Sequence, residues 1–475
     1  MEYVALKAIH ATGKGSEFFD ESLKKLESRG LLHWDRQTNK YDLHPIVRRY
    51  AYERLTVPDR TAAHTRLVDY FAAVPKPEKI EKLEDLAPVI ELYHHMVRAG
   101  KLDEATVLFN ERLNSPLYYQ LGAYQLITEL LQSLFLDGEG NPPKLKTKRA
   151  QSWISTALAN AYSLSGQPAR GIPLFQICAR LDEGENDKRN LAIDLGNLAS
   201  MAQIYIGALG EAERNLRRAI QLDKESESGY DEACDRKELG HLLSYRGAWQ
   251  EAEQELDSAL TMSEKQHAVQ TEGIVWSYCA MRFLLMARDN DQRLAIIYQR
   301  SAIENATRAL ELADEDARTS YPVERDYVSA HWLLGAAYRA SGDQAQAETH
   351  LGESLRRCRE INNVENEADI LLELAKLRHA QGNRAESLRL AQEALVITER
   401  SGYVLQGADV HLWLAELAWE GIREKGEVEK GVSGKEAALV HAREALRLAH
   451  CEDGPPYYYK VAYEEAERMI EKFSD

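Results

Sequence analysis

The residue types that can act as acids, nucleophiles or metal ligands are plentiful in this chain, but their spacing forms no catalytic pattern. The 475 residues include 14 His, 5 Cys and 76 Asp and Glu. No HExxH, GxSxG or GxGxxG string occurs, and no Cys stands in a CxxC pair. His94 and His95 are adjacent, and neighbours on a helix point in different directions, so they cannot share one metal ion. We therefore expect no enzyme activity, no metal and no cofactor.

One string in the chain partly matches the motif of a nucleotide-binding P-loop. A P-loop needs GxxxxGK[ST], in which glycines shape a loop of backbone amides and the Lys reaches the terminal phosphates. Residues 12–16 read Thr-Gly-Lys-Gly-Ser. The earlier glycine is missing, Gly15 replaces the Ser or Thr that binds magnesium, and no apolar strand precedes the string. We expect no P-loop here.

The charge balance disfavours several classes of partner. Lys and Arg number 59 against 76 Asp and Glu, a net charge of −17. Such a surface repels the phosphate backbone of nucleic acids. No apolar run approaches the about 18 residues that cross a membrane, and the N-terminus lacks a secretion-signal layout. With widely spaced cysteines that predict reduced thiols, these features predict a cytoplasmic protein without nucleic-acid or membrane partners.

A repeat with a period near 40 residues organises the chain from about residue 85 onward. Its marker is a small residue in the first helix of each repeat, found at Ala159, Ser200, Gly240, Ala280, Gly335, Ala375 and Ala415. Successive spacings are 41, 40, 40, 55, 40 and 40 residues. Apolar residues around each marker recur at i, i+3 or i+4, and i+7, which predicts amphipathic helices.

This pattern predicts stacked helical hairpins. Small residues let two helix backbones approach closely, and a Gly such as Gly342 ends the first helix because it accepts the left-handed conformation. A single hairpin cannot bury its apolar face, so the hairpins must stack into a superhelix. The expected fold class is all-α: a right-handed α-solenoid of about seven or eight hairpins, preceded by a small winged-helix domain.

Two insertions interrupt the period. We attribute the spacing of 55 to an extra stretch, DNDQRLAIIYQ, that separates the two helices of one repeat, and REKGEVEKGVSG interrupts the last clear repeat. The expected organisation is a partial winged helix at 1–60, a helical linker at 61–84, irregular first hairpins at 85–150, a regular array at 151–450 and a C-terminal capping helix at 451–475.

The first 60 residues follow a different plan. Apolar residues at helical spacing over 18–26 predict a helix that Gly30 ends. Leu31–Trp34 and Lys40–Leu43 predict two short strands, and Pro45 opens another helix. Helix, two-strand wing and helix is a winged-helix plan. DNA reading is the weaker alternative, because residues 1–60 hold 11 Lys and Arg against 9 Asp and Glu.

Two family resemblances follow from these residues. The repeat resembles the tetratricopeptide repeat, in the longer-helix variety found in kinesin light chains and bacterial signalling ATPases. The string LHPIVRRYAYERL resembles the end of the winged-helix domain in STAND-class signalling ATPases (NB-ARC-like). There a His contacts the β-phosphate of bound ADP and helps hold the inactive state; here the matching residues are Leu43, His44 and Pro45, with Pro where plant members have Asp.

The resemblance implies that His44 senses the nucleotide state, if an ATPase module is present. Because the chain has no P-loop, it implies the C-terminal part of a longer ATPase, whose upstream nucleotide-binding module would dock on this chain. A natural stand-alone protein, with His44 merely structural, is the alternative.

In tetratricopeptide superhelices the first helices line the concave face. Positions three before, one after and four after each marker are expected to point there. The candidate partner-binding residues are Asn160, Ser163, Lys237, His241, Ser244, Trp332, Arg339, Leu372, Lys376, His379, Glu416 and Trp419. Cations beside aromatic residues suit an acidic peptide or anionic ligand. The alternative is that some of these side chains pack between helices.

Three functions remain open at this level. The first is a sensor that binds a protein or peptide trigger in the concave groove and relays it through the winged helix. The second is a constitutive scaffold for partner proteins. The third is a small-inducer sensor of a transcription regulator.

Overall fold

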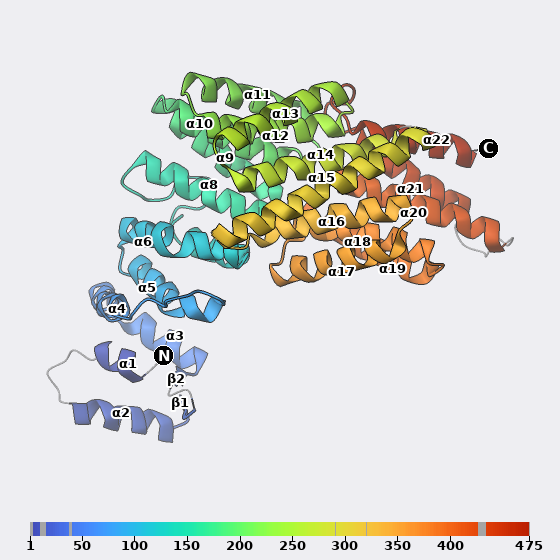
Figure 1. Cartoon of the computed structure of the whole chain (residues 1–475). Coiled ribbons are helices and arrows are strands. Elements are labelled where there is room, and N and C mark those ends of the chain that lie inside the picture. Colours follow the sequence, from blue (N-terminus) through green and yellow to red (C-terminus); the bar gives the residue numbers. More distant parts are fainter. Residues whose placement is uncertain are drawn as a thin grey trace. The chain divides into compact units, whose positions relative to one another are not determined.

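The computed structural model of the chain describes residues 3–9, 16–37, 40–289, 291–319, 321–425 and 434–474. It divides into two compact units, which we call the N-terminal unit (1–117, 132–136 and 144–146) and the array unit (118–131, 137–143 and 147–475). Over the described residues the regular structure is helical apart from one two-stranded antiparallel sheet (Figure 1). The string that falls short of a P-loop lies, except for Ser16, outside the described residues.

The N-terminal unit contains short helices and the sheet. Its elements are α1 (Tyr3–Ile9), α2 (Ser16–Ser28), β1 (Leu32–Asp35), β2 (Lys40–Leu43), α3 (Pro45–Arg54), α4 (Val57–Ala72), the 3-10 helix η1 (Leu83–Leu86), α5 (Ala87–Arg98), α6 (Leu102–Leu108) and the π-helical η2 (Phe109–Asn114). Helix, hairpin and helix follow one another in the order expected of a winged helix, with Leu32 opposite Leu43.

Helix α3 differs from the others in its exposure. Pro45 occupies its first turn, where the missing N–H of proline costs nothing. None of its residues is buried, and Ile46 and Tyr50 are 72% and 59% exposed. His44 precedes the helix as its N-cap residue and is exposed, and its side chain makes no capping hydrogen bond.

The array unit is built of helices joined by turns and loops. Its elements are the π-helical η3 (Pro116–Gln120), which begins in the N-terminal unit, α7 (Tyr124–Gln132), α8 (Lys148–Leu164), α9 (Pro168–Gly184), α10 (Lys188–Leu198), η4 (Ala199–Gln203), α11 (Leu209–Glu225), α12 (Gly229–Tyr245), α13 (Trp249–Lys265), α14 (Val269–Arg288), α15 (Gln292–Thr319), α16 (Glu324–Ser341), α17 (Gln344–Glu360), α18 (Val364–Ala380), α19 (Arg384–Ser401), α20 (Val404–Lys425), α21 (Gly434–Ala449) and α22 (Lys460–Ser474). From α8 to α21 these helices pair in sequence into hairpins of tetratricopeptide type (Figure 1).

The small marker residues explain how tightly each hairpin packs. A Cβ added at Gly335 in α16 would lie 2.5 Å from Cγ of Leu351 in α17, and one at Gly240 would lie 2.6 Å from Cγ of Leu256. The large residue of the second helix therefore fills the space that the small residue leaves. Between the helices of the α16–α17 hairpin, Gly342 adopts φ +90° and ends the first helix.

The expectation that the extra residues of the 55-residue spacing lie between two helices was wrong. The extra residues do not separate two helices of ordinary length; they prolong them, because α14 spans 20 residues and α15 spans 28. The inserted sequence carries Leu294, Ile296 and Ile297 at spacings a helix tolerates, and the Phe283 and Tyr298 rings stack at 6.0 Å across the extension. The later insertion, REKGEVEKGVSG, lies largely outside the described residues.

The two ends of the repeat region are less regular. Residues 101–150 hold π-helical turns, the short α7 and an irregular loop rather than an ordinary hairpin. At the other end α22 packs on α20 and α21, and Phe473 stacks on Trp419 with ring centroids 4.6 Å apart. All five cysteines are free.

Candidate binding chamber in the array unit

The first helices of successive hairpins surround a cavity. Its volume is about 210 Å³, and its wall comes from α8, η4, α12, α14, α16, α18 and α20, with two alanines of α15. A second cavity of about 160 Å³ adjoins it. The residues that line both cavities are Tyr245, Met281, Trp332, Leu333 and Asp369. We call the two cavities together the central chamber.

One face of each first helix supplies the lining. In α18 the chamber residues include Glu365, Asp369, Leu372 and Lys376, which lie ten, six and three residues before and one after the marker Ala375. Steps of four, three and four residues keep side chains on one helix face. The amphipathic pattern that builds the array therefore also aims polar side chains into the chamber.

A satisfied ion-pair cluster lies on one side of the first cavity. Lys237 pairs with Glu238, and the Tyr278 hydroxyl donates to both carboxylate oxygens of Glu238 at 3.1 and 3.2 Å. The His241 ring stacks on Tyr278 at 4.1 Å. Burial alone would raise the pKa of Glu238, but the Lys237 ammonium and His241 hold it at about 2.

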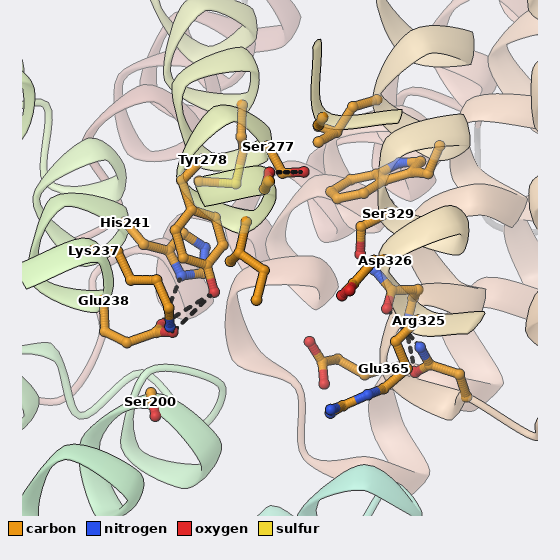
Figure 2. A pocket seen from close by; sticks show the side chains of 18 of the residues that line it. Ser200, Lys237, Glu238, His241, Ser277, Tyr278, Arg325, Asp326, Ser329 and Glu365 are labelled. Atoms are coloured by element: carbon orange, nitrogen blue, oxygen red, sulfur yellow. Dashed lines mark hydrogen bonds and ion pairs between the residues drawn. The ribbon is translucent and has the colours of Figure 1, made fainter. Parts of the chain in front are cut away.

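A less satisfied group faces this cluster across the cavity (Figure 2). The Arg325 guanidinium lies over the Tyr118 ring at 5.0 Å and makes no ion pair within the described part of the chain. Burial raises the pKa of Asp326 to about 6, although Arg325 opposes the shift. Glu365 accepts a hydrogen bond from the Tyr205 hydroxyl, and burial raises the pKa of this carboxyl as well.

The second cavity holds two neutralised carboxylates. Glu373 pairs with Arg339 and, at 2.8 Å, with Lys376. Asp409 accepts from Arg288 at 2.8 Å and from the Tyr459 hydroxyl at 2.9 Å. Each of these buried acids thus has a cationic partner from the chain itself.

The structure brings six of the predicted groove residues to the chamber and leaves six elsewhere. Those that line it are Lys237, His241, Trp332, Arg339, Leu372 and Lys376. Ser163 and Ser244 are buried and donate to carbonyls of their own helices, so they pack between helices. The others outside the chamber lining are Asn160, His379, Glu416 and Trp419. His379 pairs with Glu420 at 3.0 Å, and Trp419 is covered by α22.

The expectation of a basic groove was wrong. Each predicted cation faces a carboxylate, Lys237 with Glu238 and both Arg339 and Lys376 with Glu373. Glu238 and Glu373 each lie two residues before a marker, a position that the expected groove lining did not include. Extending the same helix face one and two turns upstream finds the missed residues Arg325, Ser329, Glu365, Asp369 and Asp409.

Three buried polar atoms in the chamber wall have no hydrogen-bond partner among the described residues. They are Nδ1 of His241, Nε of Arg325 and Nε1 of Trp332. Leaving a buried donor or acceptor unpaired costs about 1–3 kcal/mol, so such groups call for an explanation. All three belong to residues that line the first cavity.

The array unit closes on itself beside the chamber. The backbone N–H of Val404 donates to the carbonyl of Tyr205 at 2.7 Å, and that of Glu452 donates to Gly207 at 3.2 Å. Arg246 reaches the carbonyl of Pro456 at 2.9 Å. Turns of early hairpins therefore touch late ones about 200 residues away.

The described residues lack a metal-binding cluster and a membrane-spanning helix. No group of three or more His, Cys, Asp and Glu lies close enough there to hold a metal ion. No described helix is long and apolar enough to span a membrane.

Comparison with known proteins gives similarity in structure alone. No family model matches the chain, and no curated protein matches it. A STAND protein with a tetratricopeptide repeat sensor from Pyrococcus horikoshii is 15% identical over 89% of this chain, with a TM-score of 0.41. The chain spans 58% of that protein's length.

Two other solved structures show likenesses of the same order. Aspartyl phosphate phosphatase F from Bacillus subtilis is 12% identical, covering 79% of this chain and 96% of its own, with a TM-score of 0.46. A Rap protein in complex with Competence and Sporulation Factor is 12% identical over 82% of this chain and 97% of its own, with a TM-score of 0.44. These scores are low, and the repeat architecture rests on the hairpins of this chain.

Proposed function

We propose that this chain is a non-catalytic sensing region whose central chamber binds a peptide segment of a protein partner. The observation that carries the proposal is that polar atoms of His241, Arg325 and Trp332, which all line one cavity, have no hydrogen-bond partner among the described residues. Peptide carbonyls are acceptors for the Arg325 and Trp332 donors. An aromatic and polar lining with few fixed polar groups is typical of ligand sites.

The size of the chamber limits what it can hold. Its cavities of about 210 and 160 Å³ admit a few side chains of an extended segment, not a folded domain. The partner-binding candidates that fit this role are Lys237, His241, Trp332, Arg339 and Lys376 from the original set, with Arg325 and Glu365 added. A constitutive scaffold is the weaker interpretation, because cavities of this size suit a peptide segment better than the folded surface of a partner protein.

We propose further that occupancy of the chamber is relayed through the N-terminal unit to a nucleotide-binding module encoded upstream. Support comes from the helix–hairpin–helix order, the exposed His44 at the start of α3 and the exposed apolar side chains of that helix. A ligand can act as a switch only if it binds one state better than the other. A longer reading frame with GxxxxGK[ST] ahead of residue 1 tests this part.

The binding proposal is tested by selecting random octapeptides displayed on ribosomes against the purified chain. We expect a convergent peptide family that the double variant Arg325→Met, Trp332→Phe no longer retains, because both donors are removed while volume is nearly kept. Arg300→Met on the exposed surface of α15 is the matched control and should retain the peptides. No convergent peptide, or equal retention by the double variant, would refute peptide binding in the chamber.

A further inference from the structure

Asp369 occupies the wall shared by the two cavities and lacks a counter-ion. Its one hydrogen bond in the described structure is from the amide of Gln406, at 3.5 Å. No Lys, Arg or His of the described residues forms an ion pair with it. Burial and the neighbouring Asp409 raise the pKa of its carboxyl well above the usual range. The chain thus leaves this carboxylate of the second cavity without an ion-pair partner among the described residues.

The other carboxylates that line the second cavity each have a cationic partner, so the lack of one at Asp369 is an exception there. Glu373 has Arg339 and Lys376, and Asp409 has Arg288. A buried charge without a partner is strongly disfavoured, so an unpaired acid in such a wall is held neutral until a cation arrives. Glu373 and Asp409 are already paired with cations of the chain, whereas Asp369 has no cationic partner among the described residues.

Aromatic rings surround the same position. Tyr245 and Trp332 line both cavities with Asp369. Tyr245 is held by an edge-on contact with Tyr459 at 5.1 Å, and Trp332 packs against two core clusters while its Nε1 stays unpaired. Cations bind favourably over the faces of Trp and Tyr, most strongly when they are desolvated.

We propose that the junction of the two cavities receives the cationic side chain, Lys or Arg, of the bound peptide, with Asp369 as its counter-ion beside the Trp332 and Tyr245 rings. This inference rests on the proposed function and specifies its ligand. It replaces the acidic peptide expected from the sequence by a peptide with a basic residue. The remaining donors, Arg325 and Trp332, are left for the peptide's carbonyl groups.

The peptides selected on the chain provide the test. We expect one position in the convergent family to be Lys or Arg. Replacing that residue by norleucine, which keeps the length and removes the charge, should weaken binding about 30-fold, equivalent to about 2 kcal/mol. Asp369→Asn should weaken the basic peptide by a similar factor and should leave the norleucine peptide unaffected, because the two changes remove the same interaction.

Two controls distinguish the effect of removing the Asp369 carboxylate from an effect on folding. Asp257→Asn removes the same charge from the exposed surface of α13 and should not alter affinity. Asp369→Asn should unfold at the same temperature as the parent or higher, because it removes an uncompensated buried acid. Binding of the basic peptide should release a proton from the parent chain and none from Asp369→Asn, as measured by calorimetry in two buffers of different ionisation enthalpy.

The outcomes distinguish the two proposals. A convergent family without a basic residue, or equal affinity of the parent and Asp369→Asn for the basic peptide, would overturn the cation site and leave peptide binding standing. Failure to select any peptide would overturn both. A basic residue whose effect vanishes with Asp369→Asn would establish the site.

Discussion

At the scale of single residues, the two glycines inside the helices of the α16–α17 hairpin occupy opposite environments. Gly335 faces Leu351, whose Cγ would lie 2.5 Å and whose backbone N 3.1 Å from an added Cβ. Gly352, in the next helix, has nothing within 4 Å of that position. Both are in helix interiors, where Ala is favoured over Gly by about 1 kcal/mol. The difference between them is therefore a direct measure of helix–helix contact.

We predict opposite effects of the same substitution at these glycines. Gly352→Ala should raise the unfolding temperature, because only the helix propensity changes. Gly335→Ala should lower it, because forcing Leu351 and its backbone away costs about 1–3 kcal/mol and exceeds the propensity gain. Thermal unfolding followed by circular dichroism measures both. Equal stabilisation by the two variants would show that the hairpin relaxes without cost.

The sequence was least informative about which charged residues of the chamber are paired with an opposite charge. Six of the twelve residues expected near the markers, among them Lys237, Trp332 and Arg339, line the chamber. Part of the carboxylate pairing is within one helix, since Glu238 directly follows Lys237 and Glu373 lies three residues before Lys376. The pairing of Arg339 with Glu373 joins two helices, and no spacing within one helix reveals it. Asp369 could have been found by extending the face upstream, but its lack of a cation depends on the surrounding helices.

At the scale of the helical hairpin, one contact position holds different residue pairs in successive repeats. The residue four before the marker meets a residue of the second helix. Histidines meet there twice: the Nδ1 atoms of His331 and His350, and those of His411 and His441, lie 2.9 Å apart. The hairpin between them has Leu371 and Leu390 at the equivalent places, both buried. The fold therefore accepts an apolar pair at this position.

These histidine pairs predict a loss of stability in mild acid. Burial first, and the partner histidine second, lower the pKa of His331 and of His411 to about 4. In the unfolded chain histidine titrates near about 6.5, so the unfolded state binds more protons between these values. Their contribution is complete above about pH 6.5 and is lost as the pH falls toward 4. The urea midpoint should fall accordingly.

The leucine pair supplies the variant for this prediction. His331→Leu with His350→Leu copies the α18–α19 hairpin and should reduce the pH dependence by up to about 1.4 kcal/mol per pH unit for each histidine removed. Glu353, Asp314 and Arg357 also act on His331 and stay in place in both chains. Urea midpoints at pH 7.5 and 5.0 give the comparison. An unchanged difference between the two pH values would assign the acid sensitivity to other groups.

At the scale of the hairpin series, the helices were predicted well where the markers are regularly spaced and poorly where the spacing is irregular. Markers 40 or 41 residues apart indicated the paired helices, because in each repeat a small residue is needed where the two helices are in close contact. The 55-residue interval was misplaced, since a polar stretch with Leu294 and Ile297 can extend a helix as well as interrupt it. Residues 101–150, with their π-helical turns, have no repeating neighbour to define their register.

At the scale of the array unit, closure is the property that sequence patterns do not contain. It depends on contacts such as the Val404 N–H to Tyr205 carbonyl bond, between residues about 200 positions apart, and backbone groups carry no sequence signature. Closure matters for function because it decides how a ligand reaches the chamber. A peptide either passes through existing openings or waits for early and late hairpins to separate.

A disulfide across the closure distinguishes these routes. A Cβ added at Gly166, in the α8–α9 turn, would lie 3.2 Å from Cβ of Val364 at the start of α18, near the about 3.5–4.5 Å of a disulfide. We predict that oxidised Gly166→Cys, Val364→Cys binds a selected peptide much more slowly than its reduced form, because separation of the hairpins is blocked. Stopped-flow association before and after dithiothreitol measures this in one protein, so the strain of a side chain at Gly166, with φ +83°, is common to both arms. Equal rates would show that the peptide enters the closed array, and Asp369 would then be reached without any opening of the superhelix.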